Sequence, residues 1–294
     1  MIGMKIFIAG GTGFIGKNII EQLGGVYTFF SPSHSVLDLL DKQAVLSFLE
    51  KTRPDIVIFS ANVGGKRNQS DQNFLQDNLR MFFNVVSGKK YFGRMIVLGS
   101  GAEYDKRRPI VKIKEDSFGE CIPADAYGFG KYIMSEFSGQ VDYITHLRLF
   151  GIYGKNEDYQ VRFISNTICK KLFGLPITMH KNVFFDYIYI KDLVNILKYF
   201  IENKPKEKYY NIGMGEPVDL LSLARIINDL EEGKQEIKIK VEGLNNEYSC
   251  NTDRLKECIG DYKFTSHKEA IKEMFEYYKS IKEKLDKKVF LEED

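Results

Sequence analysis

The chain has 294 residues, of which 44% are hydrophobic and 28% charged, so it can bury a full core in one large domain or two closely joined lobes. Its 42 basic and 40 acidic residues give a formal net charge of +2, which excludes a strong positive field for nucleic acid. No apolar run approaches the roughly 18 residues of a membrane span, and no signal-peptide core develops at the start. We therefore expect a cytoplasmic protein with no nucleic-acid or membrane partner.

Short β-branched apolar runs alternate with amphipathic stretches through the first half of the chain, as in repeated strand-helix-strand units. Helices that would cover both faces of the resulting sheet are predicted at 14–23, 43–50, 71–86 and 124–138. Strands are predicted at 5–9, 26–30, 55–60, 94–99 and 143–147. The pattern predicts an α/β fold built on a doubly wound parallel Rossmann sheet.

After Gly154 the alternation becomes mixed, which indicates a smaller C-terminal α/β lobe for the substrate. Its elements, together with those that complete the sheet, are predicted as helices at 161–173, 192–201, 220–230 and 267–284 and a strand at 209–212. Asp219 is the expected N-cap of the third helix. We assign 1–155 and 184–213 to the Rossmann domain and 156–183 and 214–294 to the substrate lobe. The charged end, 287–294, is expected to fray.

The cysteines are Cys121, Cys169, Cys250 and Cys258. They are widely spread and form neither a CxxC pair nor a Cys-His set at metal spacing. Free thiols in a reducing compartment fit best, and we expect no metal site.

A glycine loop follows the first strand directly and opens the first helix, with the sequence Gly10-Gly-Thr-Gly13-Phe14-Ile15-Gly16. At this spacing Gly10, Gly13 and Gly16 allow a tight turn, close approach of a pyrophosphate to the backbone, and close helix-strand packing. The position between a strand and a helix favours dinucleotide binding over an ordinary turn. We expect the five named residues to bind the cofactor.

The end of the second strand carries no acidic residue to bind the ribose hydroxyls of NAD(H) and repel a 2′-phosphate. It carries the hydroxyls of Ser31 and Ser33 and the imidazole of His34, which can bind a phosphate. We therefore expect NADP(H) to be preferred, while NAD(H) stays open because no Arg is present there.

Tyr127 and Lys131 are four residues apart in a predicted helix, so they share one face. An adjacent ammonium lowers the pKa of a phenol and makes it useful in proton transfer near neutral pH. Ser100 ends a buried strand, which is where parallel sheets place their chemistry. We interpret these three residues as a catalytic set, although each type also occurs in purely structural positions.

These motifs resemble the extended short-chain dehydrogenase/reductases, in particular the NAD(P)-dependent epimerase/dehydratase family, and the resemblance extends through 148–154, 185–192 and 210–217. It implies that Ser100 hydrogen-bonds the substrate oxygen and that Lys131 binds the nicotinamide ribose. Further cofactor contacts are expected from Leu39, Ser60, Ala61 and Asn78. The resemblance also implies a homodimer, formed through the helices that carry Asn78 and Tyr127.

Within this family the segments 37–45, 60–65 and 98–104 look most like the GDP-L-fucose synthase group, which epimerises and reduces a 4-keto-6-deoxy sugar with NADPH. The epimerising Cys and His of that group are replaced by Ala102 and, approximately, Arg162, and neither of these can shuttle protons at neutral pH. Dehydration is also disfavoured, because the acidic residues that dehydratases carry after the catalytic hydroxyl are missing from Ser100-Gly-Ala102.

We therefore expect NADPH-dependent reduction of the C4 ketone of a nucleotide-linked 4-keto-6-deoxy sugar, for bacterial surface polysaccharides. An NAD-dependent C4 epimerase and a non-catalytic nucleotide-binding regulator stay open as alternatives. Lys170 is a further candidate for the diphosphate, although such charges are equally often surface residues. The expected contacts with the nucleotide-diphosphate sugar are Ala102, Glu103, Arg162, Phe185 and Arg254.

Overall fold

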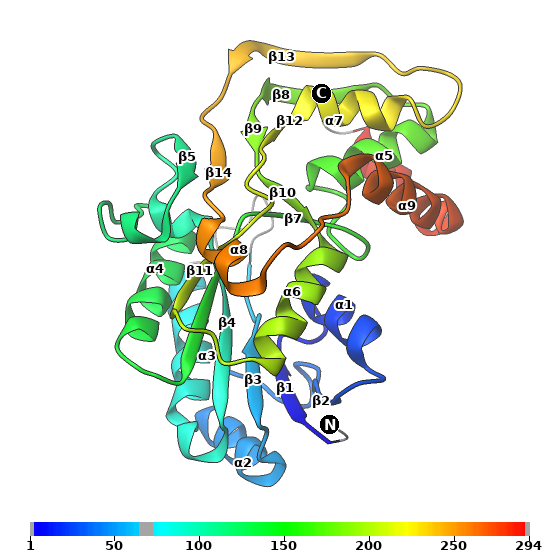
Figure 1. Ribbon diagram of the computed structural model, residues 1–294. Helices are drawn as coiled ribbons and strands as arrows, with labels where there is room; N and C mark the ends of the chain where they lie inside the picture. Colours follow the sequence, from blue (N-terminus) through cyan, green and yellow to red (C-terminus); the bar gives the residue numbers. More distant parts are fainter. Residues whose placement is uncertain (1–2, 65–72, 292–294) are drawn as a thin grey trace.

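The structure, a computed structural model, describes residues 3–64 and 73–291. Its centre is a sheet of six parallel strands with helices on both faces (Figure 1). From one edge to the other, the order is β11 (Tyr209–Ile212), β6 (Ile144–Leu149), β4 (Arg94–Ser100), β3 (Ile56–Phe59), β1 (Lys5–Ala9) and β2 (Thr28–Phe30). The predicted doubly wound parallel Rossmann sheet is confirmed.

The helices that cover the sheet form two groups. One group consists of α2 (Lys42–Thr52), α3 (Phe74–Ser87) and α4 (Ala126–Gly139), and the other of α1 (Phe14–Leu23) and α6 (Ile190–Glu202). Side chains alternate between the two faces along each strand, so Ile8 packs into the core that contains α1 and α6, and Phe7 into the core under α2 and α3. Both faces are buried, which explains the nearly continuous apolar strands.

The strand order reverses between β1 and β3, because β2 lies on one side of β1 and the later strands follow β3 on the other. In open parallel sheets, ligands bind at the carboxyl ends of the strands where the order reverses. Gly10 follows β1 and Ala61 follows β3, and a Cβ on Gly10 would lie only 2.7 Å from the backbone nitrogen of Ala61. The glycine loop therefore lies at this reversal.

A smaller α/β part lies beyond the carboxyl ends of the central strands (Figure 1). Its strands are β12 (Val218–Asp219), β9 (Phe184–Phe185), β14 (Tyr248–Cys250) and β5 (Ile110–Ile113) in one mixed sheet, β13 (Ile237–Leu244) paired with β8 (Ile177–Asn182), and β10 (Tyr187–Tyr189) paired with β7 (Gly151–Tyr153). Its helices are α5 (Phe163–Phe173), α7 (Leu220–Asn228), α8 (Asp253–Ile259) and α9 (His267–Ser280). Asp219 caps α7 as predicted, accepting from the backbone N–H of Ser222 at 3.1 Å.

The predicted division at 1–155, 156–183, 184–213 and 214–294 stays a prediction. β5 and β9 fall inside the ranges predicted for the Rossmann domain, yet they pair with β14 and β12 in the sheet of the smaller part. The chain thus crosses between the two parts more often than a pattern of consecutive elements indicates.

The expectation that 287–294 frays is wrong for the residues that the structure describes. Lys287–Phe290 form a 3-10 turn, and Phe290 is buried, with its ring 5.9 Å from those of Tyr159 and Phe173. One aromatic side chain therefore ties down a segment that is otherwise charged. Residues 292–294, Gly65 and the first two residues of the helix predicted at 71–86 lie outside the described residues.

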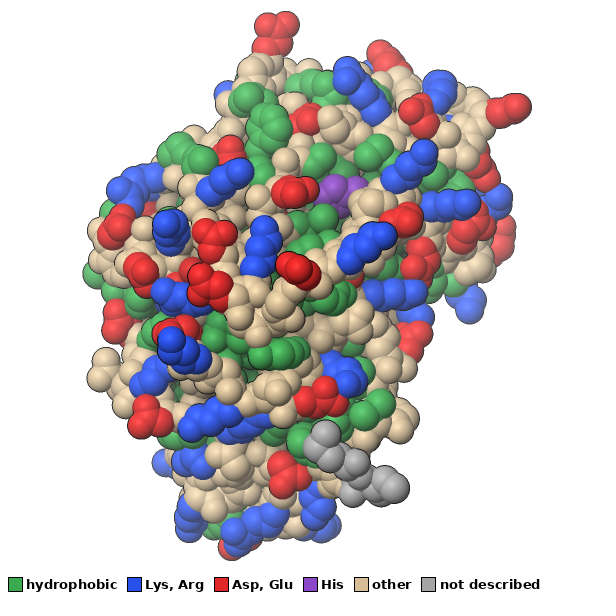
Figure 2. All heavy atoms as spheres, viewed as in Figure 1, with side chains coloured by type: hydrophobic (Ala, Val, Ile, Leu, Met, Phe, Trp, Pro, Cys, Tyr) green, Lys and Arg blue, Asp and Glu red, His purple; other side chains and the backbone are tan. Residues whose placement is uncertain are grey.

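Charged side chains of both signs are intermixed over the face shown in Figure 2. Between residues 3–64 and 73–291, no helix is long and apolar enough to cross a bilayer. The four cysteines are free thiols, and two of them, Cys169 and Cys250, are buried.

Candidate active site

The glycine loop joins β1 to α1 in a closely packed turn. Gly10 has a φ of +92°, which L side chains rarely adopt, and its carbonyl accepts from the N–H of Gly13 at 3.1 Å. A Cβ on Gly16 would lie 2.5 Å from that same carbonyl, so the first helical turn packs directly on the loop. The helix begins at Phe14 and Ile15 with no side-chain cap and no acidic residue in its first turn. Its free N–H groups form a site for an anion.

The end of β2 faces this loop through Ser31. A Cβ on Gly11 would lie 2.4 Å from the Cβ of Ser31, so little space separates the two backbones. Ser33 makes a local hydrogen bond within its turn, and the exposed His34 approaches the carboxylate of Asp38 at 3.6 Å. Of the predicted residues at this strand end, Ser31 thus directly contacts the glycine loop.

The end of β3 forms the other side of the crevice. Ser60 donates from its hydroxyl to a carbonyl at the end of β1 at 3.0 Å, and Ala61 follows against the glycine loop. Asn78 is 4% exposed, and its amide both accepts from the N–H of Val63 and donates to the carbonyl of Val63, each at 3.1 Å. Asn78 therefore holds the loop after β3 in place, while Leu39 is half-buried.

The three predicted catalytic residues lie together at the carboxyl end of β4. Asp125 caps α4 and sets the start of the helix, so that Tyr127 and Lys131 occupy the same side of it. Ser100, the last residue of β4, lies close enough to Tyr127 for its hydroxyl to lower the pKa of that tyrosine. Lys131 is 6% exposed and donates from Nζ to the carbonyl of Leu98 at 2.9 Å.

The electrostatics of this group differ from the expectation that Lys131 lowers the pKa of Tyr127. Burial raises the pKa of Tyr127 above its usual value, and the hydroxyl of Ser100 and the charge of Arg162 only partly offset this. Burial also lowers the pKa of Lys131 to about 8, because the ammonium has little contact with water. The structure thus shows the ammonium of Lys131 bound to a backbone carbonyl, and the pKa of Tyr127 is raised by burial.

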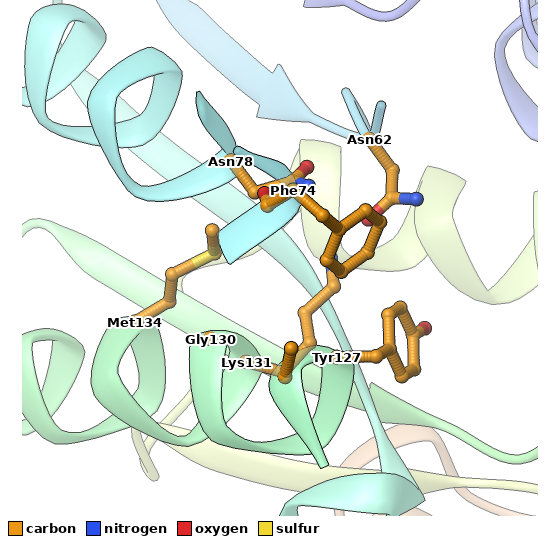
Figure 3. Close-up of a pocket in the computed structure, with 8 residues that line it drawn as sticks. Asn62, Phe74, Asn78, Tyr127, Gly130, Lys131 and Met134 are labelled. Atoms are coloured by element: carbon orange, nitrogen blue, oxygen red, sulfur yellow. Dashed lines mark hydrogen bonds between the residues drawn. The ribbon is translucent and has the colours of Figure 1, made fainter. Parts of the chain in front are cut away.

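A small pocket lies beside the catalytic helix (Figure 3). Tyr127 and Lys131 line it from α4, Phe74 and Asn78 line it from α3, and Asn62 lines it from the loop after β3. The ring of Phe74 faces that of Tyr127, with 6.4 Å between the centroids. The pocket thus lies between the candidate catalytic residues and the loop after β3.

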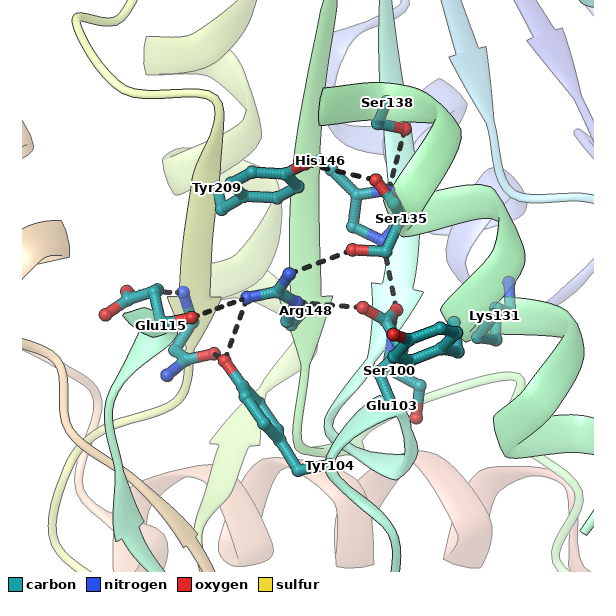
Figure 4. A network of polar contacts seen from close by, with 12 residues as sticks. Ser100, Glu103, Tyr104, Glu115, Lys131, Ser135, Ser138, His146, Arg148 and Tyr209 are labelled. Carbon is teal, nitrogen blue, oxygen red and sulfur yellow. Dashed lines mark hydrogen bonds and ion pairs between the residues drawn. The ribbon is translucent and has the colours of Figure 1, made fainter. Parts of the chain in front are cut away.

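A buried ion-pair network lies behind Ser100 (Figure 4). Glu103 accepts from the backbone N–H of Ser100 at 2.8 Å, contacts Nε2 of His146 at 3.0 Å, and accepts from Nε of Arg148 at 2.8 Å. The side chains of Glu103, His146 and Arg148 have no exposed surface. Burial alone would raise the pKa of Glu103, but His146 and Arg148 hold it at about 2, so it stays ionised.

Arg148 is further surrounded by polar and aromatic partners. Its guanidinium donates to the hydroxyls of Tyr104 at 3.0 Å and Ser135 at 2.9 Å, and it lies over the rings of Phe118 and Tyr209 at 4.2 and 4.6 Å from their centroids. A buried charge needs such partners to offset its lost hydration. The network therefore fixes the segment that follows β4.

This architecture is shared with known proteins. The model of the NAD dependent epimerase/dehydratase family matches residues 6–213, which is more than half of the chain. The chain belongs to this family. It is 26% identical over 251 residues to a GDP-L-colitose synthase of Yersinia pseudotuberculosis, with 76% of this chain and 81% of that protein covered.

Two solved structures confirm the fold of this epimerase/dehydratase family member. A GDP-L-fucose synthetase of Naegleria fowleri bound to NADP has a TM-score of 0.84 and 17% identity, with 95% of each chain covered. A GDP-mannoheptose C4 reductase of Campylobacter jejuni with NADP bound has a TM-score of 0.81 and 20% identity, with 95% of this chain and 99% of that one covered. The resemblance predicted from the sequence motifs is thus confirmed at the level of family and fold.

The dinucleotide that the family name implies fits the residues present. The glycine loop is packed so closely that a Cβ at Gly10 or Gly16 would collide with backbone atoms, and the N-terminus of α1 carries no side-chain cap. Both features suit the pyrophosphate of a dinucleotide.

The predicted substrate contacts separate into two groups. Ala102 and Glu103 are 1% and 0% exposed, so this structure offers a substrate almost no surface at either residue. The expectation for Glu103 is corrected: its carboxylate is an interior ion-pair partner. The charge of Arg162, by contrast, acts on Tyr127, and the ring of Phe185 lies 5.0 Å from that of Tyr248.

The remaining cations proposed for the diphosphate have protein partners. Nη2 of Arg254 contacts the carboxylate of Asp116 at 2.6 Å, and Lys170 is buried and donates to the hydroxyl of Thr178 at 2.7 Å. Of the three cations, Arg162 is the one whose charge acts on Tyr127.

Sequence reasoning missed two neighbours of the catalytic group. Lys106 lies over the ring of Tyr127 at 5.6 Å, and the hydroxyl of Tyr248 lies 2.6 Å from the place that a Cβ on Gly101 would occupy. Neither residue belongs to a motif, and Tyr248 comes from a short strand in the other part of the molecule. The pairing of β14 with β5 and β9 brings it to the site.

Proposed function

We propose that this protein reduces the C4 ketone of a nucleotide-linked 4-keto-6-deoxy sugar with NADPH, in the synthesis of surface-polysaccharide precursors. The observation that carries the proposal is the placement of Tyr127 beside Ser100 at the end of β4, at the sheet edge that also carries the glycine loop. A ketone that is reduced needs a hydrogen-bond donor at its oxygen and then a proton, and these two groups supply both.

The residues have distinct roles in this chemistry. The bound cofactor supplies the hydride. The hydroxyl of Ser100 donates to the ketone oxygen and polarises the carbonyl, and Tyr127 then delivers its proton to the developing alkoxide. The raised pKa of Tyr127 suits this direction, because a phenol that donates a proton must first hold one. Lys131, which lines the pocket together with Tyr127, binds the ribose hydroxyls of the cofactor.

The surroundings of Ser100 favour reduction over dehydration or epimerisation. Dehydration needs a further acid-base group beside the sugar, and so does epimerisation by proton removal at a carbon next to the ketone. Ala102 has none, and the carboxylate of Glu103 is fully buried in its ion pair with Arg148. What remains at this strand end is able to move a hydride and one proton.

The relatives support the substrate class and the cofactor. Their names describe a GDP-L-colitose synthase, a GDP-L-fucose synthetase and a GDP-mannoheptose C4 reductase, and the two structures contain NADP. The end of β2, with Ser31 and no acidic residue at 31–34, is consistent with a 2′-phosphate. Arg162 and Phe185 are the proposed contacts for the sugar nucleotide, and NAD(H) is the alternative cofactor.

The test is a panel of nucleotide-linked 4-keto-6-deoxy sugars, assayed for NADPH consumption by the purified protein. We expect stoichiometric oxidation of NADPH with at least one sugar and faster turnover than with NADH. Interconversion of nucleotide sugars with tightly held cofactor and no net consumption would instead establish a C4 epimerase. Cofactor binding without turnover of any sugar would establish the non-catalytic regulator.

We also propose that two copies pair through α3 and α4. These helices pack side by side, and Phe83 is 38% exposed on α3 although its ring contacts that of Phe137 on α4 at 5.3 Å. A partly exposed aromatic pair on neighbouring helices suits a two-fold interface in which the same surface serves both copies.

A further inference from the structure

Three half-buried aromatic side chains form a continuous strip in the smaller part of the molecule. The ring of Phe185 lies between those of Tyr248 and Tyr187, with its centroid 5.0 Å from the first and 5.3 Å from the second. Each of the three keeps some exposed surface. Tyr248 joins the strip because β14 pairs with β9, which sets Tyr248 directly opposite Phe185. We call Tyr248, Phe185 and Tyr187 the aromatic strip.

Buried rings hold both ends of the strip. At one end the ring centroid of Phe150 lies 4.8 Å from that of Tyr248. At the other end the ring centroid of Tyr153 lies 5.8 Å from that of Tyr187. Phe150 and Tyr153 are 7% and 1% exposed, so they belong to the interior. The aromatic strip is therefore the accessible section of a longer run of packed rings, and its position is fixed from both sides.

The strip lies across the carboxyl ends of two neighbouring strands of the central sheet. Gly101 directly follows β4, and a Cβ there would lie 2.6 Å from the hydroxyl of Tyr248. Gly151 begins β7 just after β6, and a Cβ there would lie 2.8 Å from the ring of Tyr187. β4 and β6 are adjacent and parallel, and ligands bind beyond the carboxyl ends of such strands. The strip therefore runs along the candidate active site, starting at the residue after Ser100.

The strip offers a ligand ring carbons and few polar groups. Asp186, between Phe185 and Tyr187 in the chain, has no exposed surface, and its carboxylate accepts from the N–H groups of Met214 and Gly215 at 2.7 and 2.9 Å. The polar side-chain atoms of the strip itself are two phenol oxygens. Such a wall suits C–H and methyl groups, whereas a sugar hydroxyl pressed against it loses its hydrogen bonds to water.

We propose that the aromatic strip binds the methyl group at C6 of the sugar, and so selects 6-deoxy sugars over sugars with a hydroxyl at C6. This inference rests on the proposed function, which places the C4 ketone at Ser100 and Tyr127. A sugar held in this way turns one of the two edges that flank C4 toward Gly101 and the strip. The edge that ends in the C6 methyl is the apolar one of the two, so it is the edge that packs on the rings.

Matched pairs of GDP-linked sugars test this selectivity, GDP being the nucleotide of the named relatives. Each pair consists of a 6-deoxyhexose and the hexose that differs only by its C6 hydroxyl, one pair in the galacto and one in the manno configuration. Calorimetric titration in the presence of NADP should show tighter binding of the 6-deoxy sugar in at least one pair, by about tenfold to 100-fold. Equal affinities in both pairs, or no binding of any of the four sugars, would overturn the inference.

Phe185→Gln tests the strip itself, because it places an amide that can hydrogen-bond a C6 hydroxyl in the middle of the rings. We expect the preference for the 6-deoxy sugar to fall to about twofold or less, mainly through weaker binding of that sugar. Phe264→Gln is the matched control. Phe264 is also half-buried beside a tyrosine, Tyr262, with 5.0 Å between the centroids, but that tyrosine bonds to Asp192 on α6. A preference that persists in Phe185→Gln would contradict the role of the strip.

A measurement by NMR covers the case in which Phe185→Gln does not fold. In a deuterated chain with protonated phenylalanine rings, the C6 methyl of the bound sugar should show a nuclear Overhauser effect to the ring of Phe185. Phe185→Tyr keeps the ring packing and identifies that signal by its loss. A bound sugar whose methyl shows no contact with Phe185 would overturn the inference. None of these binding measurements needs turnover, so a failure of the reductase proposal in the NADPH assay is seen separately.

Discussion

The backbone N–H of Ser100 donates to the carboxylate of Glu103 at 2.8 Å, so the candidate catalytic serine is attached directly to a fully buried ion pair. The serine side chain in turn accepts from the N–H of Ala102, and the two bonds form a capping box around the turn that follows β4. Because Arg148 holds the other carboxylate oxygen, the turn cannot shift without breaking a buried charge pair. The rigidity of Ser100 therefore originates in Glu103 and Arg148.

Glu103→Gln should reduce the free energy of unfolding by about 3 kcal/mol, because it leaves the buried guanidinium of Arg148 without its counter-charge. Denaturant unfolding followed by circular dichroism measures this directly. Glu21→Gln is the control, since Glu21 pairs with Lys155 at the surface and should cost less than about 1 kcal/mol. Equal effects of the two substitutions would show that the buried pair is not what fixes this turn.

Gly16→Ala should weaken NADPH binding by at least about tenfold, because the new Cβ would lie 2.5 Å from the carbonyl of Gly10 and force the loop to move. Titration of NADPH fluorescence measures the dissociation constant. Gly25→Ala is the matched control, since a Cβ at Gly25 meets no atom within 4 Å. Unchanged binding in Gly16→Ala would mean that the cofactor does not depend on the shape of this loop.

The elements that sequence predicts best are those fixed by local pattern. β1 and α1 begin and end at the predicted residues, because an apolar run and the glycine loop mark both boundaries. The lengths of other elements differ by a few residues, as with the strand predicted at 26–30, which is observed as Thr28–Phe30. Fraying at strand and helix ends depends on neighbours that a local pattern does not contain.

The site shows the same division between local and tertiary information. Tyr127 and Lys131 are brought together by helical spacing, which a sequence reveals. Glu103 reads as a polar residue beside a catalytic serine, and only the adjacent strand, which supplies Arg148 and His146, makes it an interior ion. Tyr248 has no signal of its own, because its position beside Gly101 depends on how one short strand pairs across the molecule.

Ser31→Asp should weaken NADPH binding about tenfold and leave NADH binding unchanged or tighter, because a carboxylate here repels a 2′-phosphate and accepts from ribose hydroxyls. Ser31 is the right position, since its Cβ lies against the glycine loop. Fluorescence titration with both cofactors measures the ratio, and Ser35→Asp, at an exposed position of the same turn, is the control. An equal loss for NADPH and NADH would contradict the assignment of this strand end to the 2′-phosphate.

Phe83→Asp should convert the expected dimer to a monomer, because it places a charge in the proposed apolar contact between α3 and α4 of two copies. Analytical ultracentrifugation measures the change in mass. Val36→Asp, at a residue that is 76% exposed in the loop after β2, should leave the assembly unchanged. A wild-type protein that sediments as a monomer at all concentrations would contradict the proposed dimer.

The pKa of Lys131 leads to a prediction about pH. Burial lowers it to about 8 from its usual value of 10.5, so the ammonium form that binds the ribose and attracts the anionic cofactor is lost as the pH rises through 8 in the free enzyme. We expect kcat/KM for NADPH to be constant below about pH 7 and to fall above about pH 8.

The Lys131→Arg variant tests whether the fall in kcat/KM above about pH 8 comes from Lys131 or from the ionisation of Tyr127. A guanidinium stays charged throughout the accessible range, so any activity that the variant retains should show no fall near pH 8. Tyr127, whose pKa is raised by burial, stays protonated in the same range and cannot cause the fall in kcat/KM near pH 8. If the fall near pH 8 persists in Lys131→Arg, a group other than Lys131 controls the binding of the cofactor.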